Sequence, residues 1–248
     1  MPKYDAMTVV EHLSELRTRI IRVLIVLVLT MIAGFFLAQR MLNYFKTVPP
    51  ASEISWHAFS PMDGLRIYMT LAFVIALACT LPFILYQLWG FVKNGLKPEE
   101  QRAALTYIPY TFLCFIVGLS FAYLVVFPMC MKFTTGISDR LGLVPTYGVA
   151  QYFGFMLNII LPLSLAFDLP LIVMFLTKLR LLNPVLLHKF RRYAYLVLVI
   201  TASLISPPDL VSHLLVAIPM FGLYEISVIL SRFVHRQQLQ KSHQTVLI

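Results

Sequence analysis

Residues 67–92 read IYMTLAFVIALACTLPFILYQLWGFV, a stretch with no charged side chain between Arg66 and Lys93. An α-helix rises 1.5 Å per residue, so about 20 residues cross the hydrocarbon core of a bilayer, which is about 30 Å thick. The stretch is therefore long enough and apolar enough to form a membrane-spanning helix.

The rest of the chain repeats this pattern, which predicts an all-α membrane protein with six transmembrane helices. Only 12% of the residues are charged, against about 25% in an average soluble domain. The fifth apolar stretch is long enough for about 21 Å of helix, so helices five and six are expected to form a short hairpin. We expect one integral membrane domain over residues 1–233 and a polar, disordered tail over residues 234–248. The six predicted spans are residues 20–38, 67–92, 103–131, 152–176, 193–206 and 210–231.

The distribution of Lys and Arg predicts the orientation of these spans. Basic residues are concentrated in residues 1–22, 93–102 and 178–192 and in the C-terminal tail, which alternate with connections that hold few of them. By the positive-inside rule, both termini are cytoplasmic. The net charge of +9 follows from this asymmetry and from attraction to anionic lipid headgroups, so it does not indicate a nucleic-acid partner.

The sequence shows no motif that would carry catalysis. Cys79, Cys114 and Cys130 all lie inside apolar stretches without CxxC spacing, and the six histidines are scattered. HExxH, GxSxG and glycine-rich phosphate-binding motifs are absent from the sequence. We therefore expect no metal site, no cofactor and no enzymatic activity.

Two connections on the outer side carry specific turn signals. The fifth and sixth spans are separated only by Pro207-Pro208-Asp209, which predicts a tight hairpin with Asp209 as the N-cap of the last helix. The loop over residues 39–66 is rich in proline and aromatic residues. This composition favours an ordered cap packed on the helix ends, with a plain connecting loop as the alternative.

Acidic side chains on the basic, cytoplasmic side are candidates for binding. Glu15 can pair with Arg19 at i+4, a local contact worth about 0.2–0.5 kcal/mol, and periodicity alone favours this structural explanation. Glu99 and Glu100 follow Pro98, so they complement the dipole of a helix that begins there. Carboxylates also bind the planar guanidinium group through two parallel hydrogen bonds, so the same residues suit a receptor for a cationic peptide.

Asp168 is predicted to lie inside the fourth span, about ten residues from Lys178. An isolated charge there costs at least about 2.5 kcal/mol. One explanation is a protonated carboxyl satisfied within the bundle, with Ser164 as a possible hydrogen-bond partner. Another is a polar contact for an inserted helix. A proton-coupled secondary transporter that uses Asp168 is the alternative function, although the sequence shows no internal repeat or Gly-broken half-helix to support it.

Glu225 is expected to lie about 9 Å below the cytoplasmic end of the sixth helix. Arg22 and Arg17 are cations at a similar depth in the first helix. We therefore predict that Glu225 forms a structural ion pair across the bundle with Arg22 or Arg17, and that removing one partner is costly.

The segment His12-Leu13-Ser14-Glu15-Leu16-Arg17-Thr18-Arg19 resembles the N-terminal signature of the TatC family, the multispanning receptor subunit of the twin-arginine protein translocase. The resemblance covers nearly the whole chain, with its motifs in order. Further matches are Phe59-Ser60-Pro61, Leu85-Tyr86-Gln87-Leu88-Trp89-Gly90-Phe91, Phe121-Ala122-Tyr123, Phe127-Pro128, Ser206-Pro207-Pro208-Asp209, Ile218-Pro219-Met220 and Leu223-Tyr224-Glu225-Ile226.

The resemblance implies a function in protein transport across the bacterial cytoplasmic membrane, driven by the proton-motive force. TatC proteins recognise the paired arginines in the signal peptide of a folded precursor. The partners implied are TatA- and TatB-type single-span subunits, Arg-Arg signal peptides, the bilayer and further copies of the chain. TatC proteins usually have Glu or Gln at the position of Asp168. In the family, this face is associated with binding the single-span subunits. The positions that match the signal-binding site are Glu15, Glu100, Leu16, Arg17, Phe91 and Glu99.

Overall fold

The structure, a computed structural model, describes residues 9–49, 51–93, 98–143, 146–178, 182–206 and 209–246. Within these ranges every regular element is a helix. Five helical segments are long and apolar enough to cross a membrane. The prediction of an all-α, multi-pass membrane protein is therefore confirmed.

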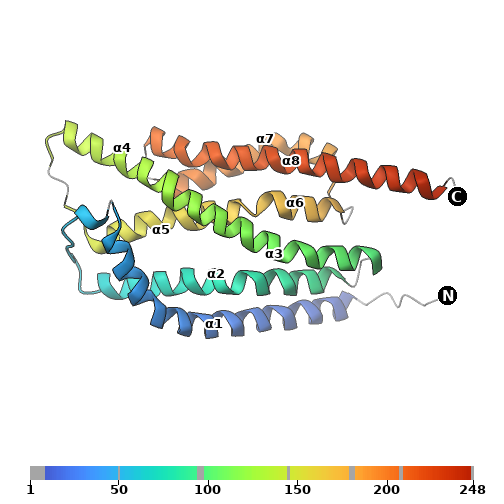
Figure 1. The fold of residues 1–248 in the computed structure, drawn as a ribbon, viewed down its shortest axis with the longest axis horizontal. Coiled ribbons are helices and arrows are strands. Elements are labelled where there is room, and N and C mark those ends of the chain that lie inside the picture. Colours follow the sequence, from blue (N-terminus) through green and yellow to red (C-terminus); the bar gives the residue numbers. More distant parts are fainter. Residues whose placement is uncertain are drawn as a thin grey trace. The chain divides into compact units, whose positions relative to one another are not determined.

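The chain divides into two compact units, residues 1–45 with 68–108 and residues 46–67 with 109–248. The first contains most of α1 (Val9–Thr47) and α2 (Asp63–Lys93), together with the beginning of α3 (Pro98–Phe121). Figure 1 shows α1 alongside α2, in blue and cyan. The start of α3 at Pro98 confirms the helix start predicted for this segment.

Small residues bring α1 and α2 into direct contact. A Cβ atom added at Gly34 on α1 would lie 2.7 Å from the carbonyl oxygen of Ala72 on α2. Four residues before Gly34, the hydroxyl oxygens of Thr30 and Thr80 are 2.8 Å apart. Close backbone approach and hydroxyl hydrogen bonds are the usual means by which membrane helices associate, because apolar burial gives little gain in lipid.

In the second unit, α3 continues through one π-helical segment, η2 (Ala122–Val126), into α4 (Phe127–Arg140). The N–H of Phe127 donates to the carbonyl of Ala122, five residues earlier. Pro128 follows and has no N–H to continue the normal i to i−4 ladder. The proline therefore accounts for the π-helical segment.

The predicted fourth span consists of two helices, α5 (Val149–Ala166) and α6 (Leu169–Lys178). The break falls at Phe167 and Asp168, because Pro170 cannot donate a hydrogen bond to the preceding turn. Gly118 on α3 gives Phe167 room, since a Cβ there would lie 2.7 Å from the Cβ of Phe167. Asp168 thus occupies an interruption in the membrane pass instead of a continuous helix.

The last two helices are α7 (Pro184–Ile205) and α8 (Leu210–Val246), and α8 packs against both α6 and α7 (Figure 1). The expectation of two short helices was wrong for α8, because α7 has 22 residues and α8 has 37, of which Leu210–Gln238 is long and apolar enough to cross a membrane. The side chain of Asn183 caps α7 by accepting a hydrogen bond from the N–H of Val185 at 3.1 Å.

The expectation of a disordered tail was wrong, because α8 continues through residues 234–246. The sequence contains no glycine or proline after Gly222, so nothing in it stops the helix. The Gln238 side-chain amide donates to the carbonyl of Lys178 at 2.7 Å, which attaches this extension to the end of α6.

Both connections that carry turn signals contain described contacts. Asp209 caps α8, because its Oδ2 accepts a hydrogen bond from the N–H of Ser212 at 2.6 Å. Pro207 and Pro208 lie outside the described residues. In the other connection, Trp56 stacks on Phe153 with ring centroids 5.5 Å apart.

Two sets of hydrogen bonds, one between backbone groups and one to a side-chain carboxylate, also hold the loop before α2. The N–H of Val149 donates to the carbonyl of His57 at 2.9 Å, which joins the loop to the start of α5. Asp63 accepts from the N–H groups of Phe59 and Ser60 at 2.9 and 3.0 Å. The loop is therefore the ordered cap that its composition favoured.

Candidate functional site

The structure places Glu15 in an ion pair on α1. Both Nε and Nη2 of Arg19 donate to Oε1 of Glu15, at 3.0 and 2.6 Å. The side chains of Arg19 and Glu15 are 19% and 20% exposed. The i, i+4 contact considered from the sequence thus exists, and about a fifth of each side chain stays exposed.

Arg19 also contacts α2, which the sequence did not predict. Its Nη1 donates to the side-chain oxygen of Gln87 at 3.2 Å and to the backbone carbonyl of Gln87 at 3.4 Å. Gln87 itself is buried. The guanidinium group therefore bridges a carboxylate on α1 and an amide on α2.

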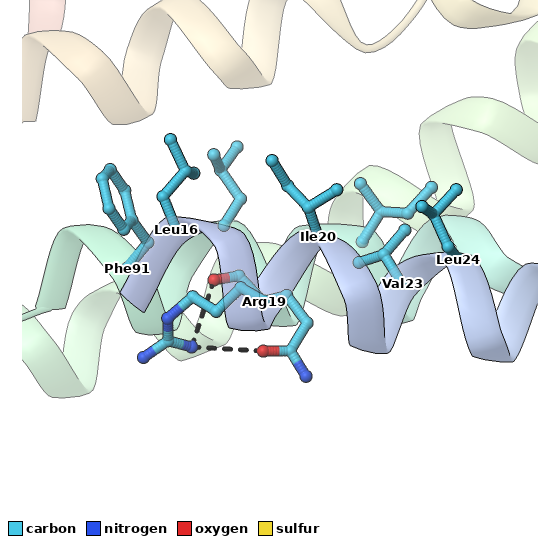
Figure 2. Close-up of a pocket in the computed structure, with 9 residues that line it drawn as sticks. Leu16, Arg19, Ile20, Val23, Leu24 and Phe91 are labelled. Carbon is cyan, nitrogen blue, oxygen red and sulfur yellow. Dashed lines mark hydrogen bonds between the residues drawn. The ribbon is translucent and has the colours of Figure 1, made fainter. Parts of the chain in front are cut away.

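An apolar groove of about 210 Å³ lies beside this bridge, between α1 and α2. Figure 2 shows Leu16, Ile20 and Phe91 projecting to one side of α1, while the head of Arg19 points to the other side, toward its two hydrogen bonds with Gln87. The side chains that give the groove its apolar lining include Leu16, Ile20, Val23, Leu24, Leu88 and Phe91.

Several predicted site residues thus lie together, and others lie beyond what the structure describes. Leu16 and Phe91 both line the groove, and Arg17 is exposed on the same turn as Glu15. Glu99 and Glu100 lie in the first turn of α3, but their side chains fall outside the described residues. The joint placement of Glu15 and Glu100 remains a prediction.

Asp168 is buried, with 4% of its surface exposed. Its Oδ1 has no hydrogen-bond partner among the described residues. Ser164, the partner considered from the sequence, donates instead to the carbonyl of Ile160 at 2.6 Å. A buried polar atom without a partner is costly, so this position has capacity for a polar contact from outside the chain.

Glu225 has a different partner from the one predicted. Both oxygens of its carboxylate are bound by Arg191 of α7, with Nε donating to Oε1 at 2.6 Å, and the hydroxyl of Tyr195 also donates to Oε1. Arg22, the predicted partner, is exposed on α1. Matching residues by depth failed because it took no account of α7, the helix that packs against α8.

The sequence identified Arg19 as a partner of Glu15 through the i, i+4 spacing. It missed two other residues of the first site and two of the second. Gln87 and Gly90 belong to the TatC-like motif at the end of α2, but their contact with Arg19 depends on how α1 packs on α2. Arg191 and Tyr195 are four residues apart, so they share a face of α7, which is the available sequence signal for their common partner.

Apolar spans, one of them interrupted, and an all-helical fold define a multi-pass helical membrane protein. Residues 11–219 match the family described as Sec-independent protein translocase protein (TatC). The chain belongs to the TatC family.

Individual relatives agree over nearly the full length. TatC of Halalkalibacterium halodurans is 42% identical over 240 residues, covering 96% of this chain and 95% of that protein. TatCy of Bacillus subtilis is 41% identical over 240 residues, with 97% and 94% covered. The crystal structure of a twin arginine translocase receptor, TatC, is similar with a TM-score of 0.81 at 30% identity, covering 90% of this chain and 99% of that chain. None of these relatives supports the transporter alternative.

Proposed function

We propose that this chain is the receptor subunit of a twin-arginine protein translocase, which recognises the Arg-Arg signal peptide of folded precursors. The observation that carries the proposal is the partly exposed side chain of Glu15, whose carboxylate holds the guanidinium group of Arg19, a residue that also lines the apolar groove. Family membership and the similarity to the crystal structure of a twin arginine translocase receptor support it.

The chemistry of the site suits arginine better than lysine. The distances from Arg19 to Glu15 show that a guanidinium group can place two of its nitrogens on this carboxylate. An ammonium group cannot reproduce that forked geometry. Glu15 and Glu100 would each bind one arginine of the signal, with Glu99 and Arg17 nearby, and the groove formed by Leu16 and Phe91 would hold the adjoining apolar residues.

The proposed complex also includes single-span subunits of the TatA and TatB type. A helix of such a subunit that carries a polar side chain would satisfy Oδ1 of Asp168, which is buried without a partner among the described residues. We place the chain in the bacterial cytoplasmic membrane with both termini cytoplasmic, in a self-associating complex driven by the proton-motive force. It would act as a translocase component and not as an enzyme, with no cofactor.

Site-specific crosslinking tests the proposal. A precursor with an Arg-Arg signal should label the chain, and the matched Lys-Lys precursor should label it much less, because each substitution loses the forked hydrogen bonds. A Glu15→Ala, Glu100→Ala double variant should lose the labelling. Equal labelling by both precursors, or full labelling of the double variant, would contradict the proposal. Uptake of a radiolabelled solute by the purified chain would instead support a transporter.

A further inference from the structure

We infer that Arg19 is an intramolecular competitor for the signal peptide: its guanidinium group occupies Glu15 in the unliganded chain and must leave before an arginine of the signal can bind. This inference rests on the proposed function. It adds to that function a residue that sets the affinity of the site without being part of the ligand-bound contact.

The contacts of Arg19 are those expected of a bound arginine ligand. Two of its nitrogens are within 3.0 Å of one oxygen of Glu15. Its third nitrogen donates to Gln87 on the neighbouring helix. A second guanidinium group cannot take the same position on that oxygen while Arg19 remains there, because like charges in one position repel each other.

The neighbouring helix provides a specific position for this side chain. A Cβ atom added at Gly90 would lie 2.9 Å from Cζ of Arg19 and closer still to Nη1. A methyl group at Gly90 would therefore displace the guanidinium group. The head of Arg19 thus lies against Gly90 and is hydrogen-bonded to the buried Gln87, so the contact is more than a chance pairing of two exposed charges.

Both partners are accessible enough to exchange. About a fifth of each side chain is exposed, and arginine is attached through a flexible stem that can swing into water. An i, i+4 ion pair contributes little by itself, so a bound signal that contacts a second carboxylate and the groove can displace Arg19.

Competition has a quantitative consequence that separates it from other roles. If a fraction of the sites is open, the apparent dissociation constant of any ligand that needs the open site rises by the reciprocal of that fraction. Arg-Arg and Lys-Lys peptides that both require the open site are weakened by the same factor. Arg19 therefore sets affinity while leaving the preference for arginine to Glu15 and Glu100.

The test measures equilibrium binding of fluorescent Arg-Arg and Lys-Lys signal peptides to the full-length chain in lipid nanodiscs. Arg19→Met keeps the apolar stem and removes the competitor, so binding of both peptides should tighten by about threefold to tenfold. Gln87→Met and Gly90→Ala should tighten binding less. These two changes leave the net charge unaltered, so a gain cannot come from general attraction of a cationic peptide.

Two controls complete the design. Arg22→Met removes the same charge from an exposed arginine three residues along α1 and should change the affinity by less than about twofold. In a Glu15→Gln background, Arg19→Met should have no effect, because there is no carboxylate left to release.

Each outcome decides between the two proposals. If the wild-type chain binds both peptides equally, the receptor function fails. If the wild-type chain prefers the Arg-Arg peptide and Arg19→Met binds it less tightly, Arg19 holds Glu15 in position and the competitor inference is wrong. Unchanged binding in Arg19→Met, Gln87→Met and Gly90→Ala would also overturn the inference while leaving the receptor function intact. Should Arg19→Met not fold, Gly90→Ala decides alone.

Discussion

Among the residues that the structure describes, two glutamate–arginine pairs differ in position, partners and surroundings. Glu15 and Arg19 lie one turn apart on α1, beside an apolar groove. Arg191 and Glu225 join α7 to α8, and the hydroxyl of Tyr195 adds a third contact to the same carboxylate. The first pair costs little to open, because its partners are already neighbours on one helix. The second holds two helices together, so opening it disrupts packing.

Exchanging the two residues within each pair should separate these roles most strongly. The variant Glu15→Arg with Arg19→Glu keeps a local ion pair but moves the carboxylate by one turn, about 5.4 Å along α1. We expect it to lose at least about tenfold to 100-fold in affinity for an Arg-Arg peptide. The measurement is equilibrium binding to the full-length chain.

The matched exchange at the other pair is Arg191→Glu with Glu225→Arg. It keeps opposite charges on facing helices, so it should bind the Arg-Arg peptide within about twofold of the wild-type affinity. Retained binding in the Glu15 exchange, or loss in the Arg191 exchange, would reverse the assignment of the two roles.

A single change at the second pair should affect stability. Glu225→Gln leaves Arg191 and Tyr195 without the carboxylate that both bind, so we expect the thermal unfolding midpoint in detergent to fall by about 2–4 °C. The preference for Arg-Arg over Lys-Lys peptides should stay as in the wild-type chain. A changed preference with an unaltered midpoint would show that Glu225 contacts the signal.

The same contrast explains what the sequence could and could not predict. Uncharged stretches and basic loops were enough for the membrane class and the helical fold, because the bilayer restricts the chain to few solutions. The Glu15–Arg19 contact was also within reach, since a single helix determines which residues lie four apart. Contacts within one helix need no knowledge of packing.

Contacts between helices could not be predicted, because they depend on how the helices pack. Gln87 meets Arg19 because α1 packs on α2, with a close approach at Gly34 and Ala72. No spacing rule within one helix encodes that register. The partner of Glu225 was misassigned because depth along a helix says nothing about which helix is adjacent. The start of α7, by contrast, could have been predicted from Asn183-Pro184, because a capping residue followed by proline is a helix-start signal. The predicted span began later, at residue 193, because it was based on apolar residues alone.

The smallest expected effect concerns the third member of the second pair. Tyr195→Phe removes one hydroxyl that donates to Glu225 and retains the ring, which packs against Phe221 with centroids 5.0 Å apart. Because Arg191 still binds both carboxylate oxygens, the unfolding midpoint should fall by only about 1–2 °C, less than in Glu225→Gln.

In a Glu225→Gln background, Tyr195→Phe should have a smaller effect still, since the charged acceptor of the hydroxyl is gone. If the effect is undiminished in that background, the hydroxyl of Tyr195 does not stabilise the helix pair through Glu225. The Arg191–Glu225 ion pair would then be independent of Tyr195.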